Sequence, residues 1–158
     1  MNTLWKKFYD IIKSEIQKGL SAHKLALAIS FGVSFGVFPI VGTSSLFCFL
    51  IAICLKLNHV VIQTTNYLVY PLQFILLPVW LLTSNQLGLG GDVFENIKNY
   101  KLSDFYDNFY VLLKIVSFLV LGWAFIAVPF SIMLYFTLLA FLRKSIVISK
   151  EKENRDSI

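Results

Sequence analysis

The sequence GVSFGVFPIVGT occupies residues 32–43 and lies inside a segment that holds no charged residue from Leu25 to Leu55. Its three glycines and its proline cannot form a uniform helix, because proline lacks a backbone N–H and glycine lets the chain turn. In a membrane, a broken helix is tolerated only where protein or trapped water satisfies the freed backbone groups. The stretch therefore predicts either a buried re-entrant turn or the lining of a polar cavity.

Composition indicates a membrane protein. Of the 158 residues, 57% are hydrophobic and 15% are charged, and the mean hydropathy is +0.72. A soluble domain of this size has too little interior to hide so much apolar side chain, whereas long apolar runs are typical of membrane spans. The net charge of +5 comes from basic residues that flank the apolar runs. This pattern predicts membrane lipids as partners, not nucleic acid.

The predicted fold class is an all-α, polytopic membrane helical bundle. Residues 1–20 form an amphipathic helix, which we expect either to lie in the membrane interface or to pack on a partner protein. Residues 21–142 form the membrane domain and residues 143–158 a polar cytoplasmic tail. The membrane domain contains four segments: a re-entrant or kinked pair of helices at 25–55, spans at 60–87 and 110–142, and a polar external loop at 92–108.

Two prolines predict helix breaks. Each half of the first apolar block around Pro39 is about 20 Å long, whereas a full crossing needs about 30 Å. The block is therefore expected to be a re-entrant hairpin, with one long, kinked, tilted span as the alternative. In the second block, Pro71 biases Tyr70 away from the α conformation and predicts another break. The amides Asn66 and Gln73 are costly in a membrane unless partnered, so we expect them to face the protein interior.

The distribution of charge predicts the topology. Basic residues gather at both ends of the chain: Lys6, Lys7, Lys13, Lys18 and Lys24, and then Arg143, Lys144, Lys150, Lys152 and Arg155. The positive-inside rule places both termini in the cytoplasm. Both termini on one side require an even number of crossings, and the three apolar blocks satisfy this only if the first is re-entrant.

No catalytic constellation stands out, so we expect no enzyme activity, no cofactor and no metal site. His23 and His59 have no acid or cysteine at a recognisable spacing. Cys48 and Cys54 lie in an apolar run without other metal-ligand residues nearby, and we interpret them as small hydrophobic side chains. No glycine-rich loop follows a predicted strand and opens a helix, so a nucleotide site is not supported.

The motifs between Gly19 and Gly88 resemble the domain-of-unknown-function 2062 family. The resemblance lies in the order and spacing of four pieces: Gly36-Val37-Phe38-Pro39-Ile40-Val41-Gly42, Leu57-Asn58, Asn66 through Pro71, and Leu87-Gly88. The chain departs from the family pattern at Ala22 and Tyr67, where relatives carry proline, and at Val69, where threonine is frequent. The resemblance implies a bacterial inner-membrane protein that accompanies cell-envelope glycosyltransferases, and it implies no established activity.

Two broken segments, each with polar residues at its break, suggest a transporter. Transporters place helix ends near the membrane midplane, where they meet polar substrate groups, and helix N-termini favour phosphate. We predict a transporter or flippase-like protein for a phosphate-bearing lipid, such as a polyprenyl-phosphate carrier. One chain has too few spans to enclose a transport path, so we expect a homo-oligomer. By analogy, the Phe-Pro-x-x-Gly break is also similar to the re-entrant motif of DedA-type lipid transporters. The predicted binding residues are Gly36, Pro39, Gly42, Thr43, Asn66, Tyr70, Gln73, Lys24 and Lys56.

A structural interpretation explains the same residues. Glycines permit close helix packing, prolines kink helices, and buried amides hold helices together. In that case the protein is a non-catalytic membrane scaffold that partners a cell-envelope glycosyltransferase. The sequence leaves the transporter and the scaffold open.

Overall fold

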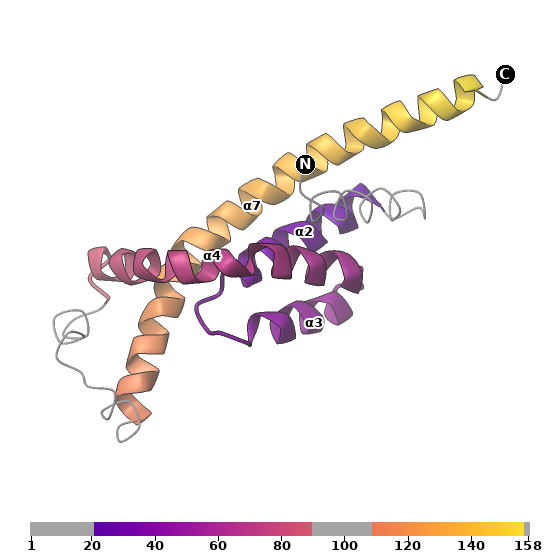
Figure 1. The fold of residues 1–158 in the computed structure, drawn as a ribbon. Helices are drawn as coiled ribbons and strands as arrows, with labels where there is room; N and C mark the ends of the chain where they lie inside the picture. The colour runs from indigo at the N-terminus through magenta and orange to yellow at the C-terminus, as the bar shows by residue number, and fades with distance from the viewer. Residues whose placement is uncertain (1–20, 90–108, 157–158) are drawn as a thin grey trace.

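The computed structural model describes the backbone of residues 21–89 and 109–156, and the side chains of residues 21–89, 109–110 and 112–144. This part of the chain is all-α, with four helices in the order α2 (Ala22–Gly36), α3 (Ser44–Cys54), α4 (His59–Gln86) and α7 (Phe109–Asp156) (Figure 1). The predicted interfacial helix at residues 1–20 and the predicted loop at residues 92–108 lie outside the described residues.

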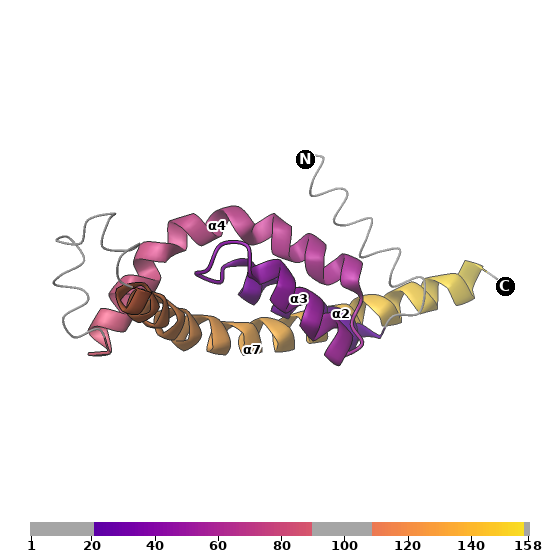
Figure 2. The same cartoon turned by 90° about the horizontal axis from the view of Figure 1, so that it is seen from below.

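α2 and α3 form a helical hairpin. The Ser21 side chain accepts a hydrogen bond from the Lys24 amide and begins α2, which ends at Gly36. Residues 37–43 form a turn in which Gly42 has a φ of +85°, a conformation that glycine adopts without steric cost. α2 and α3 are about 22 and 16 Å long at 1.5 Å per residue, and they lie side by side (Figures 1 and 2). The chain therefore turns back at the Gly-Pro stretch and does not continue as one kinked rod.

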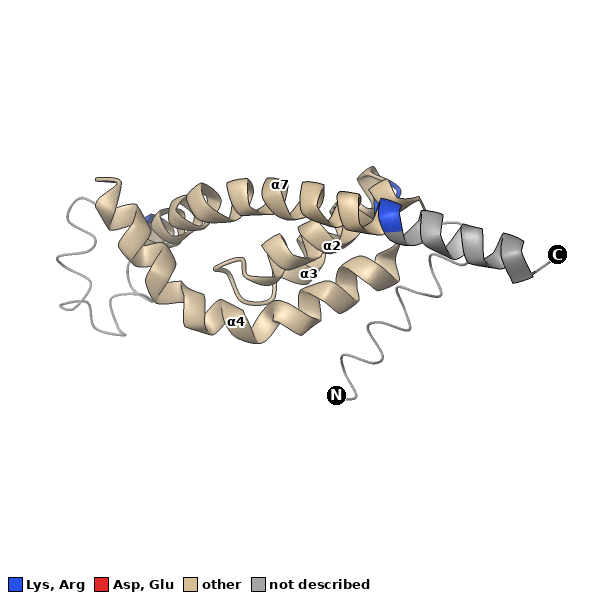
Figure 3. Cartoon of the chain, turned by 90° about the horizontal axis from the view of Figure 1, so that it is seen from above, with Lys and Arg blue, Asp and Glu red and all other residues tan. Residues whose placement is uncertain are grey.

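The predicted break around Pro71 is wrong, because α4 continues through both Pro71 and Pro78. Both prolines are exposed, on the side of the helix opposite the buried Gln73. α4 arches around the hairpin (Figure 3). Curving toward the hairpin opens the outer face, where each proline ring meets the preceding turn. The helix therefore bends instead of ending.

α7 is also longer and more continuous than predicted. It passes through Gly122 and Pro129, where the sequence suggested interruptions, and changes direction along its course (Figure 1). It also extends beyond Leu142 to Asp156, so the predicted tail begins as a helix. A Cβ added at Gly122 would collide with the Trp80 carbonyl, so a glycine is required where α7 crosses α4.

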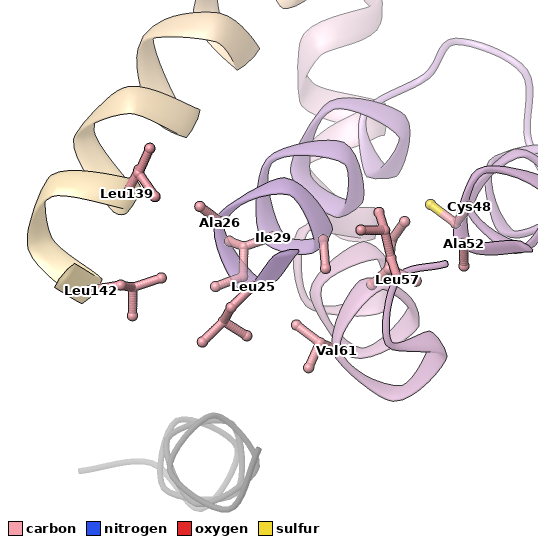
Figure 4. Packing of buried hydrophobic residues seen from close by; sticks show 11 residues of the cluster. Leu25, Ala26, Ile29, Cys48, Ala52, Leu57, Val61, Leu139 and Leu142 are labelled. Carbon is pink, nitrogen blue, oxygen red and sulfur yellow. The ribbon is translucent and has the colours of Figure 1, made fainter. Parts of the chain in front are cut away.

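The open end of the hairpin is closed by an apolar cluster, which we call the base (Figure 4). The base joins the start of α2, the end of α3, the start of α4 and the later part of α7: Leu25, Ala26, Ala28, Ile29, Cys48, Ala52, Leu57, Val61, Ile62, Leu139 and Leu142. Both free ends of the hairpin therefore lie at the same end of the bundle. Cys48 and Cys54 are free thiols, and Cys48 packs in the base as the predicted small apolar side chain.

Two described helices are long and apolar enough to cross a membrane, His59–Gln86 and Leu112–Lys144. Only 17% and 28% of their most apolar windows are buried, so most of this apolar surface faces outward. The described side chains include no Asp or Glu, and their five cations are divided unevenly (Figure 3). Lys114 lies near the start of α7. The other four lie next to residues of the base in the sequence: Lys24, Lys56, Arg143 and Lys144.

Candidate functional site at the hairpin tip

Two tryptophans hold the closed end of the hairpin, residues 37–45, which we call the tip. The Trp80 indole of α4 donates to the Val37 carbonyl at 3.3 Å, and the Trp123 indole of α7 donates to the Ser34 carbonyl at 3.1 Å. The last carbonyls of a helix have no partner within the helix. The indoles supply these partners, so α2 can end inside the protein without leaving these two carbonyls unpaired.

The start of α3 has no comparable cap. Thr43 occupies the N-cap position, but its hydroxyl donates to the Ile40 carbonyl at 3.0 Å and accepts no hydrogen bond from α3. Ser44 is fully buried, and its hydroxyl has no partner among the described residues. The first amides of a helix have no intrahelical acceptor and carry the positive end of the helix dipole. At the start of α3, the Ser44 hydroxyl is thus a buried donor without a described partner.

α4 turns an amide-bearing face toward the tip. Asn66 and Gln73 are both 0% exposed, which confirms the prediction that they face the interior. The Asn66 amide donates to the Ser45 hydroxyl at 3.2 Å, whereas Asn66 Oδ1 and both amide atoms of Gln73 have no partner within the described chain. Gln73 lies halfway between Asn66 and Trp80 on one face of α4, and therefore faces the turn. Each of these atoms raises the free energy of the folded protein, because burial removes its hydrogen bonds to water and the chain does not replace them. A bound polar group would lower this cost.

Aromatic rings give the tip an apolar surrounding. The Phe38 ring meets the rings of Phe47 and Trp123 edge-on, with centroids 5.2 and 4.9 Å apart. Pro39, the predicted break residue, is buried in the turn. Hydrogen bonds and charge interactions are stronger in such a low-dielectric environment than in water. The unpartnered atoms of the site include donors, the Ser44 hydroxyl and Gln73 Nε2, and acceptors, Asn66 Oδ1 and Gln73 Oε1, with no carboxylate among the described side chains. This combination suits a polar ligand group that both accepts and donates hydrogen bonds.

Gly36, a predicted binding residue, has a packing role. A Cβ at Gly36 would collide with the Val69 side chain, and one at Gly32 would lie 2.7 Å from the Ile62 carbonyl oxygen. The two glycines are four residues apart and therefore lie on one face of α2, which lets α4 approach closely. This close contact holds Asn66 beside the start of α3.

The other predicted binding residues divide between two places. Pro39, the exposed Gly42 and Thr43 lie in the tip, and Asn66 and Gln73 lie on the buried face of α4 that is turned toward it. The Tyr70 ring is half-buried and contacts Phe74, with ring centroids 6.2 Å apart. Lys24 and Lys56 lie at the base, at the other end of the hairpin. The structure therefore does not bring these two lysines together with the tip residues.

Lys56 occupies an unusual backbone position. It has a φ of +50°, and it ends α3 with two hydrogen bonds, from its own amide to the Ile53 carbonyl and from Leu57 to Ala52. α4 ends with the same bond pattern, but there the positive φ, +68°, belongs to Gly88. A side chain at such a position is strained where glycine is not. The Lys56 side chain therefore lies next to the base at the cost of backbone strain.

The sequence interpretation missed Trp80 and Trp123 as the residues that hold the end of α2. Both indoles lie well inside apolar segments, whereas membrane-protein tryptophans are enriched at the interfaces. Their position inside apolar segments was the signal in the sequence that could have identified them, because a buried indole N–H requires a hydrogen-bond acceptor. The identity of the acceptors could not be read from sequence, because 43 and 89 residues separate the bonded pairs.

Comparison with known proteins identifies a family. The family model described as "Uncharacterized protein conserved in bacteria (DUF2062)" matches residues 6–151. The match is wider than the motifs between Gly19 and Gly88, and it includes all four described helices except the last residues of α7. Neither the comparison with curated proteins nor that with solved structures found a match.

Proposed function

The chain belongs to the DUF2062 family of uncharacterized bacterial proteins, and for this member we propose transport or flipping of a phosphate-bearing lipid across the cytoplasmic membrane. A polyprenyl-phosphate carrier is the substrate class that we favour. The observation that carries the proposal is the group of buried polar atoms without described partners between α3 and α4. Packing alone does not require them, because apolar side chains would fill the same space at lower cost.

In this proposal, α4 and α7 cross the bilayer and the α2–α3 hairpin enters it from the cytoplasmic side. The hairpin arms, about 22 and 16 Å long, are shorter than the ~30 Å hydrocarbon core, so the tip lies near the midplane. The four cations beside the base favour a cytoplasmic base and cytoplasmic termini. The exposed apolar faces of α4 and α7 then contact lipid tails.

The phosphate is expected to meet the tip at three kinds of donor. The Ser44 hydroxyl and the Gln73 amide are buried without described partners, and the first amides of α3 carry partial positive charge. Asn66, held by its bond to Ser45, orients the start of α3 toward α4. Asn66 Oδ1 and Gln73 Oε1 can accept only from a protonated phosphate oxygen, so the site favours the singly ionised phosphate. A site made of neutral groups holds this phosphate weakly enough to release it on the other side, which transport requires.

Reconstitution into liposomes tests the proposal. Protein in vesicles that contain a fluorescently labelled polyprenyl phosphate should make the inner-leaflet label accessible to an impermeant reductant. Asn66→Ala should abolish this movement. The matched control is Thr83→Ala on the same helix. The Thr83 hydroxyl donates to the Val79 carbonyl of its own helix at 2.8 Å, so its loss should leave movement intact.

A non-catalytic scaffold that holds a cell-envelope glycosyltransferase is the second candidate function. The close approach of α2 to α4 at Gly32 and Gly36 favours it, because a rigid helical unit is sufficient for docking. Two results together would favour the scaffold over the transporter. Vesicles that contain folded wild-type protein would show no lipid movement, and an envelope glycosyltransferase would co-purify with the protein. A homo-oligomer is expected under the transport proposal, since one chain offers few spans.

A further inference from the structure

α2 and α7 enclose a groove of about 370 Å³ on a different face of α2 from the one that packs on α4. The groove is lined mostly by aromatic and branched side chains: Phe31, Phe35, Trp123, Val128, Ile132 and Phe136. Its volume lies within the ~300–1,000 Å³ of typical ligand sites. It extends from Trp123 near the tip to Tyr135 near the base. The two helices that line it run in opposite directions (Figure 1).

Serine hydroxyls line the floor of this groove. Ser30 and Ser34 are only 2% and 6% exposed, and neither hydroxyl has a partner among the described residues. Ser131 of α7 donates weakly, at 3.5 Å, to the Ser30 carbonyl and not to its hydroxyl. Two buried donors at the floor of an otherwise apolar groove favour an occupant that carries acceptor oxygens next to an apolar chain.

The base end of the groove is polar and positively charged. His23 Nδ1 and the Tyr135 hydroxyl form a hydrogen bond of 2.7 Å that links α2 to α7. The exposed Lys24 follows His23, and the exposed Arg143 lies two turns beyond Tyr135 on α7. The side chains that the structure describes include no carboxylate to neutralise these cations. This end therefore favours an anionic headgroup.

We propose that the α2–α7 groove binds an anionic glycerophospholipid of the phosphatidylglycerol kind. Its headgroup lies at the base end, with the glycerol hydroxyls near His23 and Tyr135 and the phosphate between them and Ser30, within reach of Lys24. Its ester carbonyls accept from Ser30 and Ser34, and one acyl chain follows the groove toward Trp123. The positions of Ser30 and His23 agree with this order, because seven residues of helix separate them by about 10.5 Å, with the serine on the tip side. The phosphate and the headgroup glycerol together span this length.

This site is separate from the tip, and the inference does not rest on the transport proposal. A polyprenyl phosphate lacks ester carbonyls and leaves the serines unpaired, so the groove favours a glycerophospholipid over the proposed transport substrate. The alternative occupant of the groove is a helix from a second copy of the chain. Such a helix would place side chains, and no phosphate, next to the cations at the base end. The charge beside the groove therefore favours the lipid.

Retention of defined lipids by the purified full-length protein tests the inference. Native mass spectrometry after detergent exchange should detect bound phosphatidylglycerol, with less phosphatidylcholine and less of the ether-linked phosphatidylglycerol analogue. Ser131→Leu should lower retention about tenfold, because the larger side chain fills the groove. Thr137→Leu, also on α7 but outside the groove lining, should retain lipid as the wild type does.

Two milder substitutions separate the parts of the lipid. Ser30→Ala should abolish the preference for ester over ether lipid, and Lys24→Gln should reduce the preference for phosphatidylglycerol over phosphatidylcholine. Lys114→Gln, at the other end of the bundle, should change neither. Equal retention of all three lipids by the wild type would overturn the inference. It would also be overturned if Ser131→Leu converted a lipid-free dimer into monomers, since the groove would then be an interface between copies.

Discussion

The base and the tip of the hairpin differ in how their polar groups are satisfied. The base is built from apolar side chains of four helices. Lys56, which directly precedes Leu57 of the base, is the one non-glycine residue with a positive φ in the part described. At the tip, two indoles satisfy the carbonyls that end α2, yet the Ser44 hydroxyl and the Gln73 amide next to them have no described partner. The carbonyls that end α2 are therefore satisfied by the chain, whereas the buried polar side chains near them have no described partner.

This contrast predicts that substitutions at the backbone contacts destabilise the protein, whereas substitutions at the unpaired amides remove function without destabilising it. Unfolding in detergent micelles, followed by tryptophan fluorescence, measures the first effect. Lipid movement in vesicles measures the second.

The largest effect on stability is expected for Gly36→Ala. The added Cβ would collide with the Val69 side chain and approach the Asn66 carbonyl oxygen to 2.9 Å. We expect the free energy of unfolding to fall by about 3 kcal/mol, because overpacking forces a backbone shift between α2 and α4. Gly42→Ala is the comparison for loss of a glycine without a packing contact, since no atom lies within 4 Å of that Cβ. Its φ of +85° strains alanine, so this variant should still lose about 1 kcal/mol, which is less than Gly36→Ala. Equal losses at the two positions would show that the close contact is not what stabilises the hairpin.

Gln73→Met should have the opposite sign. Methionine has a similar shape but no polar atoms, so the variant no longer buries an unpaired amide. We expect the free energy of unfolding to rise by about 1–3 kcal/mol, while lipid movement is lost. A less stable Gln73→Met protein would mean that the amide has a stabilising partner, and the proposed role of the tip would then be wrong.

Trp123→Phe should destabilise the tip moderately. The Ser34 carbonyl loses its 3.1 Å partner, and leaving a buried carbonyl unpaired costs about 1–3 kcal/mol. Trp80→Phe breaks a longer bond of 3.3 Å to Val37 and should cost less. Comparison of the two melting midpoints checks the order. No loss in either variant would contradict the role of the indoles in ending α2.

Lys56→Gly should have the smallest effect on stability. Glycine relieves the strain of a side chain at a φ of +50° and should raise the free energy of unfolding by about 1 kcal/mol. Gly88→Lys at the end of α4, where φ is +68°, should lower it by a similar amount. If Lys56→Gly destabilises the protein instead, the lysine side chain makes a contact at the base that outweighs its backbone strain.

The sequence predicted the hairpin and part of the tip, because these features are local. Pro39 and three glycines within twelve residues exclude a continuous helix whatever surrounds them. Asn66 and Gln73 were predicted to be buried because an amide cannot face lipid cheaply. The break at Pro71 was wrong because the cost of a proline depends on which face of the helix it occupies, and that face is set by the arched packing of α4 around the hairpin.

Contacts between distant segments could not be predicted from the sequence. The bonds from Trp80 and Trp123 to the end of α2, and the groove between α2 and α7, depend on which helices become neighbours. The separation of Lys24 and Lys56 from the tip followed only from the antiparallel packing of α2 and α3. The base nevertheless agrees with the charge pattern, because both flanks of the hairpin carry a lysine at the same end.

The most direct test asks on which side of the membrane the two flanks of the hairpin emerge. Single cysteines at Lys24 and Leu55, in a protein with Cys48→Ala and Cys54→Ala, would be labelled in intact cells with an impermeant thiol reagent, with a cysteine at Asn99 as the external reference. We predict that the Asn99 position labels in intact cells, and that the two hairpin positions label only after the membrane is permeabilised. Labelling of the Lys24 and Leu55 positions from opposite sides would show that the chain crosses at Pro39, which would contradict the re-entrant hairpin and the lipid site at its tip.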